Sequence, residues 1–261
     1  MYQSIITEVD DSLGILTLNK PERHNALDET LLEEATAALL ALEANPRVRV
    51  IILSATGKSF CAGADINWLK RAASNSFHEN LGDARALAGL LTTLHSISKP
   101  TIARIQGPTF GSGVGLVACC DIAVASYDAQ FALNEVKLGG LPGLAAPFIL
   151  SAIGERFARR YLLSAERFSA AEAYRIGLVH EIVPDEEQLD QALGEIIDAL
   201  LKNSSFAMAE CKTMLQAFSR QPVDAAMIED ATQRVARVRS SPEGREGLVA
   251  FLEKRRPNWI G

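Results

Sequence analysis

GPTFGSGVGLVACCD (residues 107–121) is the segment around which the rest of the sequence is organised. Glycines at Gly111, Gly113 and Gly115, followed by small apolar residues, indicate backbone that passes close to another segment and then begins a helix. The first amides of a helix lack carbonyl partners, and their partial positive charge suits an oxygen that acquires negative charge. A second glycine-containing turn, FCAGADI (60–66), can bring another free N–H to the same place. Two such donors predict an oxyanion hole.

The composition is that of a soluble globular protein, with 261 residues of which 48% are hydrophobic and 22% charged. The net charge is −6, so the chain lacks the excess of positive charge that favours binding to nucleic acid or an anionic membrane. Neither is expected as a partner. The N-terminal segment MYQSIITEVDD (1–11) lacks the basic and apolar regions of a secretion signal. Because no apolar stretch has the length of a membrane span, we expect a cytoplasmic protein.

The cysteines have no paired CxxC spacing, and two of them are adjacent in an apolar run. They are Cys61, Cys119, Cys120 and Cys211. We therefore expect buried thiols in a reducing compartment and no zinc site.

Apolar patterning predicts a parallel sheet with helices between its strands. The runs 48–53 and 101–105 are typical of strands covered on both faces, and each leads to a glycine-containing turn. Asp28 is a predicted N-cap for a helix with the apolar stripe Leu31, Leu32, Ala35, Leu39 and Leu42. Further strands are expected at 5–9, 14–18, 121–125 and 178–183, and helices at 68–73, 81–97, 145–153 and 155–164, with a polar stretch at 74–80.

The pattern becomes wholly helical after Pro184. Helices are expected at 187–203, 206–218, 222–238 and 242–255. A composition shift near Lys202 divides the chain into an α/β core, 1–201, and a helical C-terminal region, 202–261.

Glu135 is the carboxylate best placed for chemistry, because it follows a short apolar strand and precedes a glycine-rich loop in FALNEVKLGGLPG (131–143). A carboxylate beside a polarised carbonyl in a partly dry pocket can carry a proton. Asp65, after the second turn, fits equally well as the N-cap of the next helix.

Two competing motifs do not fit this sequence. The segment 113–118 matches GxGxxA, but about seven residues separate Gly113 from Asp121, whereas a dinucleotide-binding unit needs about 30. Residues 111–113 do not form a nucleophile elbow, because Phe110 stands where GxSxG requires its first glycine. A purely structural role for these glycines, in close helix packing, stays open.

Six segments carry a resemblance to a known family. They are NKPERHNAL (19–27), FCAGADI (60–66), KPTIARIQGPTFGSGVGLVACCDIAVAS (99–126), FALNEVKLGGLPG (131–143), FSAAEAYRIGLVHEIV (168–183) and SPEGREGLVAFLEKRRP (241–257). In this order they resemble the enoyl-CoA hydratase/isomerase, or crotonase, family over nearly the whole chain. The resemblance implies an α/β crotonase (ClpP-like) spiral of ββα units with a helical C-terminal trimerisation region. It also implies a homotrimer or a hexamer built as a dimer of trimers.

The same resemblance implies roles for individual residues. Ala64 and Ser112 match the residues whose N–H groups hold the oxygen of an acyl-CoA thioester, and Glu135 matches the catalytic glutamate. Ser112 stands where glycine is usual. Gly115 stands where typical hydratases carry a second glutamate.

Contacts with the CoA part of the substrate are likewise implied by the resemblance. The substrate-binding residues are expected to be Arg23, His24, Ala26, Ala62, Asp65, Ile66, Gly111 and Gly115. Phe251 and Lys254 match residues that reach the CoA of a neighbouring subunit, the lysine through phosphate. CoA belongs to the substrate, so neither a separate cofactor nor a metal is expected.

Within the family, GVGLVACCDI (113–122), ARRY (158–161) and the segment 241–257 look closest to bacterial 3-methylglutaconyl-CoA and isohexenylglutaconyl-CoA hydratases. This predicts hydration of an α,β-unsaturated acyl-CoA with Glu135 as the acid/base. Because a single carboxylate suffices to move a proton between carbons, Δ3-Δ2 enoyl-CoA isomerisation is the alternative, and other crotonase reactions share the same donors. The distal carboxylate of a glutaconyl group would need a cation. Candidates are Arg104, Lys70, Arg71 and Lys137.

Overall fold

The computed structural model describes residues 2–219 and 221–260. Within these ranges, the centre of the chain is a six-stranded sheet in the order β1-β2-β3-β4-β6-β9. Its strands are β1 (Ile5–Asp10), β2 (Leu13–Leu18), β3 (Val50–Ala55), β4 (Thr101–Ile105), β6 (Ile122–Ser126) and β9 (Glu181–Val183). β1 and β2 are antiparallel, and every later pair is parallel. The predicted parallel sheet is therefore confirmed.

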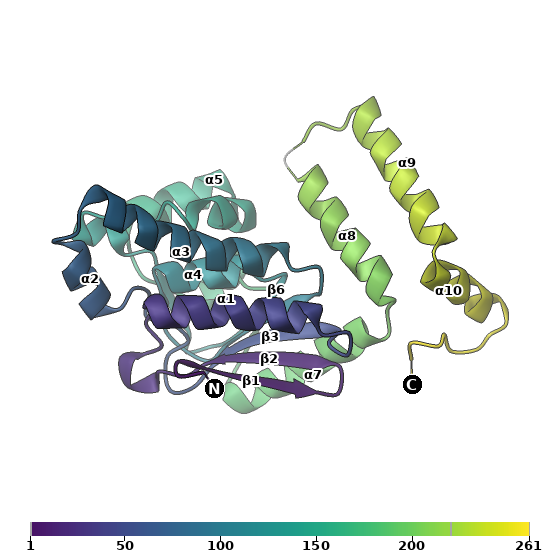
Figure 1. Cartoon of the computed structure of the whole chain (residues 1–261), viewed down its shortest axis with the longest axis horizontal. Helices are drawn as coiled ribbons and strands as arrows, with labels where there is room; N and C mark the ends of the chain where they lie inside the picture. The colour runs from purple at the N-terminus through teal and green to yellow at the C-terminus, as the bar shows by residue number, and fades with distance from the viewer. Residues whose placement is uncertain (1, 220, 261) are drawn as a thin grey trace.

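Helices cover both faces of this sheet, with α1 (Glu29–Ala44) and α3 (Phe77–Ser96) on one side and α7 (Glu186–Leu201) on the other (Figure 1). The side chains of β3 alternate between two cores: Ile51 and Leu53 join the larger one, under α1 and α3. Val50 and Ile52 join the smaller one, under α7. Burial on both faces explains the unbroken apolar run.

The start of α1 follows the sequence prediction. Asp28 caps the helix, since its Oδ1 accepts a hydrogen bond from the Leu31 N–H at 3.0 Å. The predicted apolar stripe is buried: Leu31, Leu32, Ala35, Leu39 and Leu42 all face the core, and Ala38 joins them.

The polar stretch predicted at 74–80 is wrong, because α3 already begins at Phe77, shortly after α2 (Ile66–Ala72). A reciprocal capping box starts it: Ser76 Oγ accepts from the Glu79 N–H at 3.4 Å, and Glu79 Oε2 accepts from the Ser76 N–H at 2.7 Å. This pairing satisfies helix-start amides without apolar residues, so hydrophobic periodicity misses it.

A smaller, three-stranded sheet and short helices flank the glycine-rich segment. The sheet contains β5 (Thr109–Phe110), β7 (Gln130–Ala132) and β8 (Phe168–Ser169). The helices are α4 (Ser112–Cys119), α5 (Ala146–Ser164), α6 (Ala170–Arg175), and the 3-10 turns η1 (Pro21–Arg23) and η2 (Glu135–Leu138). Gly154 kinks α5 with φ 72° and ψ 164°, which accounts for the two helices predicted there. The sequence missed β5, β8 and α6, which are very short.

The C-terminal helices α8 (Ser205–Phe218), α9 (Ala225–Ser240) and α10 (Pro242–Leu252) extend away from the α/β body (Figure 1). We call residues 202–260 the tail. No described residue of α8 or α9 is buried. The expectation of buried thiols is therefore wrong for Cys211, which is exposed on α8, although Cys61 and Cys119 are buried. None of the helices within 2–219 and 221–260 is long and apolar enough to cross a bilayer.

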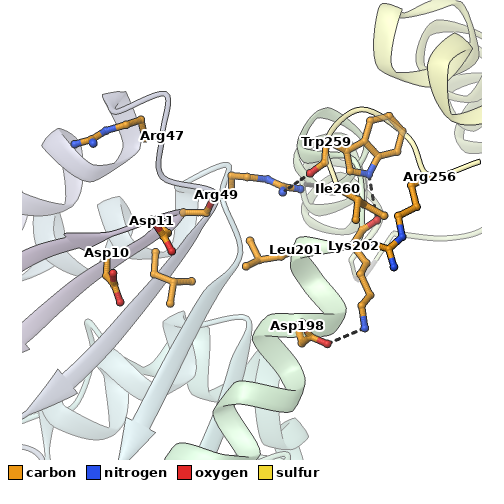
Figure 2. A pocket seen from close by; sticks show the side chains of 12 residues that line it. Asp10, Asp11, Arg47, Arg49, Asp198, Leu201, Lys202, Arg256, Trp259 and Ile260 are labelled. Carbon is orange, nitrogen blue, oxygen red and sulfur yellow. Dashed lines mark hydrogen bonds and ion pairs between the residues drawn. The ribbon is translucent and has the colours of Figure 1, made fainter.

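One arginine of the body holds both ends of the tail, as Figure 2 shows in part. Arg49 donates to the Asn203 carbonyl at 2.6 Å, to Ser205 Oγ at 2.9 Å and to the Trp259 carbonyl at 3.2 Å. The Trp259 indole N–H donates in turn to the Lys202 carbonyl at 3.1 Å. These bonds border a hollow of about 1050 Å³ between the body and the tail. Arg49, one of the cations that line this hollow, is thus already engaged.

Candidate active site

The turn 60–65 is held between two other segments. On one side, the Leu27 N–H donates to the Gly63 carbonyl at 2.7 Å, and the Asp65 N–H donates to the Leu27 carbonyl at 2.8 Å. These two bonds pair Leu27 with Ala64 as in a parallel ladder. In this geometry the backbone N–H and C=O of Ala64 point away from Leu27. No residue in the described ranges accepts a hydrogen bond from the Ala64 N–H. On the other side, the Phe110 N–H donates to the Cys61 carbonyl at 2.8 Å.

Glycines let this turn touch the start of α4. Gly63 has φ +86°, and a Cβ on it would lie 3.0 Å from the Phe110 carbonyl oxygen. A Cβ on Gly113 would lie 2.8 Å from both the Cβ and the carbonyl oxygen of Cys61. Because side chains at either position would separate the two segments, these glycines are required by close packing. The predicted convergence of the two turns is confirmed.

The second candidate donor lies at the first residue of α4. Gly111, with φ +53°, precedes the helix and donates its N–H to the Ala132 carbonyl at 2.8 Å. Ser112 follows with a negative φ, so a side chain is tolerated there without backbone strain. As the first helical residue, Ser112 has no acceptor for its N–H within the described part of the chain.

Glu135 begins η2 and lies against the same glycine. Its Oε1 is 3.1 Å from the point where a Cβ on Gly111 would stand. Its Oε2 is shielded from solvent and accepts no hydrogen bond from any described residue. Burial raises the pKa of this carboxyl above its usual value, which makes the carboxylate a stronger base. A partly dry base thus lies next to the start of α4.

Gly115 lies one helical turn further along α4 and faces packed apolar groups. A Cβ on it would lie 2.8 Å from Ala145 Cβ and 3.4 Å from Leu91 Cδ2. The helix surface at this position is therefore closed by α5 and α3. The predicted contact between Gly115 and the substrate stays a prediction.

The predicted CoA-binding loops lie side by side next to the turn 60–65. The Ala62 N–H donates to the His24 carbonyl at 2.9 Å, and Arg23 Nη1 lies 3.1 Å from Asp65 Oδ2. Asp65 also caps α2 by accepting from the Asn67 N–H at 2.7 Å. Burial alone would raise the pKa of Asp65, but the hydrogen bond from Asn67 and the Arg23 guanidinium outweigh it and lower the pKa.

The remaining predicted positions divide between the body and the tail. Ala26 is buried within the same loop region, and Ile66 is exposed at the start of α2. Phe251 and Lys254 are exposed at the end of the tail, which lies apart from α2 and α4 within one chain (Figure 1). The structure of a single chain therefore brings all the predicted residues together except these two.

The four basic residues considered as partners of a distal carboxylate differ in whether they already form an ion pair. Arg104 Nε donates to Asp190 Oδ1 at 2.7 Å, on the α7 side of the sheet, and Arg71 pairs with Glu29. These two arginines are already engaged. Lys70 and Lys137 form no ion pair with any described residue.

Asn134 is the polar residue beside Glu135 that the sequence did not single out. Its Oδ1 lies 3.4 Å from the point where a Cβ on Gly111 would stand. The signal available in the sequence was only its adjacency to the carboxylate. Among residues 2–219 and 221–260, no group of three or more His, Cys, Asp and Glu side chains could hold a metal ion.

Comparison with known proteins agrees with this geometry. The enoyl-CoA hydratase/isomerase profile matches residues 8–261. The chain belongs to the enoyl-CoA hydratase/isomerase family. Among curated members, it is 33% identical to crotonyl-CoA hydratase of Syntrophomonas wolfei over 99% of this chain and 98% of that protein. It is 30% identical to 2,3-dehydroadipyl-CoA hydratase of Escherichia coli over 95% of this chain and 94% of that protein.

A solved member of the family has the same fold. The crystal structure of an enoyl-CoA hydratase from Shewanella pealeana has a TM-score of 0.96 and 40% identity, covering 98% of this chain and 96% of that one. The predicted crotonase fold and the prediction of an enzyme of this family are confirmed.

Proposed function

We propose that the protein adds water across the double bond of an α,β-unsaturated acyl-CoA. The observation that carries the proposal is the partly dry Glu135 carboxylate, with a solvent-shielded and unpartnered Oε2, lying against the residue that precedes Ser112. The names of the related proteins, crotonyl-CoA hydratase among them, support hydration as the reaction.

In this proposal, the thioester oxygen accepts hydrogen bonds from the N–H groups of Ala64 and Ser112, which stabilise the enolate. Glu135 accepts a proton from water while the water oxygen forms a bond to C3. The electron pair of the double bond moves onto the thioester as an enolate. Glu135 then returns the proton to C2 and is again a carboxylate. The atoms of one water are thereby added.

The CoA moiety would lie along the paired loops that contain Arg23, His24, Ala26, Ala62, Asp65 and Ile66. Backbone hydrogen bonds and the Arg23–Asp65 ion pair join these loops, so the surface offered to CoA is fixed before binding. Phe251 and Lys254 would reach the CoA of a neighbouring subunit in a trimer or hexamer. The exposed apolar side chains of the tail support this assembly, since no described residue of α8 or α9 is buried within one chain.

For the acyl group, we propose a branched glutaconyl chain with a distal carboxylate. The name of the Escherichia coli relative specifies an acyl group of this charge type, a 2,3-dehydroadipyl group. Since Arg104 and Arg71 are engaged elsewhere, Lys70 and Lys137 are the cations best able to meet that carboxylate.

Mass spectrometry of the products tests the reaction. Purified protein is incubated with crotonyl-CoA, 3-methylglutaconyl-CoA and a β,γ-enoyl-CoA. We expect a mass gain of one water on an α,β-unsaturated substrate, largest for the glutaconyl thioester. A shifted double bond in the β,γ-enoyl thioester without any gain of water would instead establish the isomerase, for which a lone carboxylate suffices.

A further inference from the structure

The water that attacks C3 needs a second polar partner besides Glu135, a requirement that rests on the hydration proposed above. In the typical hydratase arrangement, another carboxylate supplies this partner from the position of Gly115. Here Gly115 has no side chain, and the surrounding helix surface is closed by Ala145 and Leu91. The second partner must therefore come from a different residue.

Asn134 lies where such a partner is needed. Its Oδ1 and the Oε1 of Glu135 stand 3.4 Å and 3.1 Å from the same point, the place of a Cβ on Gly111. Both oxygens thus lie beside Gly111, the residue that precedes Ser112. A Cβ on Gly111 would lie in close contact with both oxygens, so the glycine leaves them uncovered on this side.

The conformation of Asn134 favours a role in chemistry over a role in folding. Asn134 precedes η2, yet its side chain makes no capping hydrogen bond to that turn. No described residue bonds to its amide group, although the residue is only partly exposed. Its φ of −97° and ψ of 5° fall in the sparsely populated bridge region, where many active-site residues lie. A half-buried amide without a structural partner is uncommon.

We propose that Asn134 positions the attacking water together with Glu135. Asn134 Oδ1 accepts a hydrogen bond from one O–H of the water, Glu135 accepts from the other, and a lone pair of the water oxygen is directed at C3. Because the two side chains come from consecutive residues at the start of one 3-10 turn, their separation is fixed by the backbone. One carboxylate and one amide then do the work of two carboxylates.

Two reactions of the same enzyme separate this role from a structural one. Hydration of crotonyl-CoA needs the positioned water, whereas exchange of the C2 protons of butyryl-CoA with D₂O needs only Glu135 and the oxyanion donors. We expect Asn134→Ala to lower kcat for hydration roughly 100-fold, because a misplaced reactant costs about this much. Proton exchange should stay within about threefold of wild type. Asn134→Asp keeps an acceptor at the same place and should restore hydration to within about tenfold.

Asn258→Ala is the matched control, since Asn258 is an exposed asparagine on the tail. It should behave as wild type in both assays, and near-UV circular dichroism verifies the fold of each variant. Equal hydration by Asn134→Ala and wild type overturns the proposal, as does a parallel loss of hydration and exchange. Failure of the wild type itself to hydrate crotonyl-CoA and the glutaconyl substrate overturns the proposed function, and this inference with it.

Discussion

The region around Glu135 and the tail differ in the groups that have no partner within one chain: polar atoms in the first and apolar side chains in the second. Around Glu135 the backbone is packed so closely that Gly63, Gly113 and Gly115 have no room for a Cβ without displacement, yet polar groups there lack partners. On the tail, ion pairs such as that between Arg234 and Asp230 run along the helices, and apolar side chains such as Phe251 and Leu252 are exposed. The first region is suited to bind a small polar reactant, and the second is suited to pack against another apolar surface.

The largest expected effect tests the polar side of this contrast. Glu135→Gln removes the base while preserving the shape of the side chain, so kcat for hydration should fall about 10²- to 10⁴-fold. Binding of an acyl-CoA should remain, because the amide changes no backbone donor. Steady-state kinetics and calorimetric titration with a saturated acyl-CoA measure the two quantities. A variant that kept most of its hydration rate would remove Glu135 from its assigned role.

Next in size is a test of the packing around α4. Gly115→Glu would place a Cβ 2.8 Å from Ala145 Cβ and a charge among apolar groups. We therefore expect the free energy of unfolding to fall by about 1–3 kcal/mol or more. Thermal unfolding and kcat should both fall. Adding Ala145→Gly removes the closest contact and should recover part of the stability, which measures the coupling between the positions. Unchanged stability of the single variant would show that this helix face is more open than described.

A smaller effect sharpens the apolar side of the comparison. Ile228 is exposed on α9 within one chain, where replacement by Asp should change stability by at most about 0.5 kcal/mol. If the tail packs against other subunits, Ile228→Asp places a charge in that interface and should shift the assembly towards monomer. Light scattering after size-exclusion chromatography measures the mass, with the exposed polar change Asn258→Ala as control. A monomeric wild type would contradict the proposed assembly.

The smallest expected effect is on stability, through the burial of the Glu135 carboxyl. Its pKa is raised in the folded state by burial, so the folded protein binds its proton more tightly than the unfolded chain does. Stability from this group is therefore lost as the pH rises through the raised pKa. Glu135→Gln removes the loss and should stabilise the protein at neutral pH, with no gain below the usual pKa of glutamate. Melting temperatures at pH 4 and pH 7 distinguish this expectation from a pH-independent effect.

Much of the fold was predictable from local signals. The β-branched and apolar runs before the two turns indicated a buried parallel sheet, and Asp28 marked the start of α1. The capping box of Ser76 and Glu79 and the very short strands β5 and β8 were missed, because they depend on side-chain pairing or tertiary contact rather than on periodicity.

The candidate site was predictable in part for a related reason. Glycines and a loop glutamate mark places of close approach, and the structure brings them together. The solvent-shielded state of Glu135 and the position of Asn134 depend on neighbours distant in sequence, which no local pattern encodes. The exposure of Cys211 likewise follows from the separate tail, since a cysteine on a helix that packs against the body would be buried.

The contacts of Arg49 make the tail a closed loop of chain. One guanidinium bonds near the first residues of the tail, at Asn203, and near its last, at Trp259. The segment between these points is therefore held at both ends by one side chain, and α8 is held to the body as well, through Lys212 and Asp121 at 2.6 Å. The conformational entropy of closing this loop is already lost in the isolated chain. In the proposed assembly, each chain would present its three helices as one preassembled unit, so association would not have to order them.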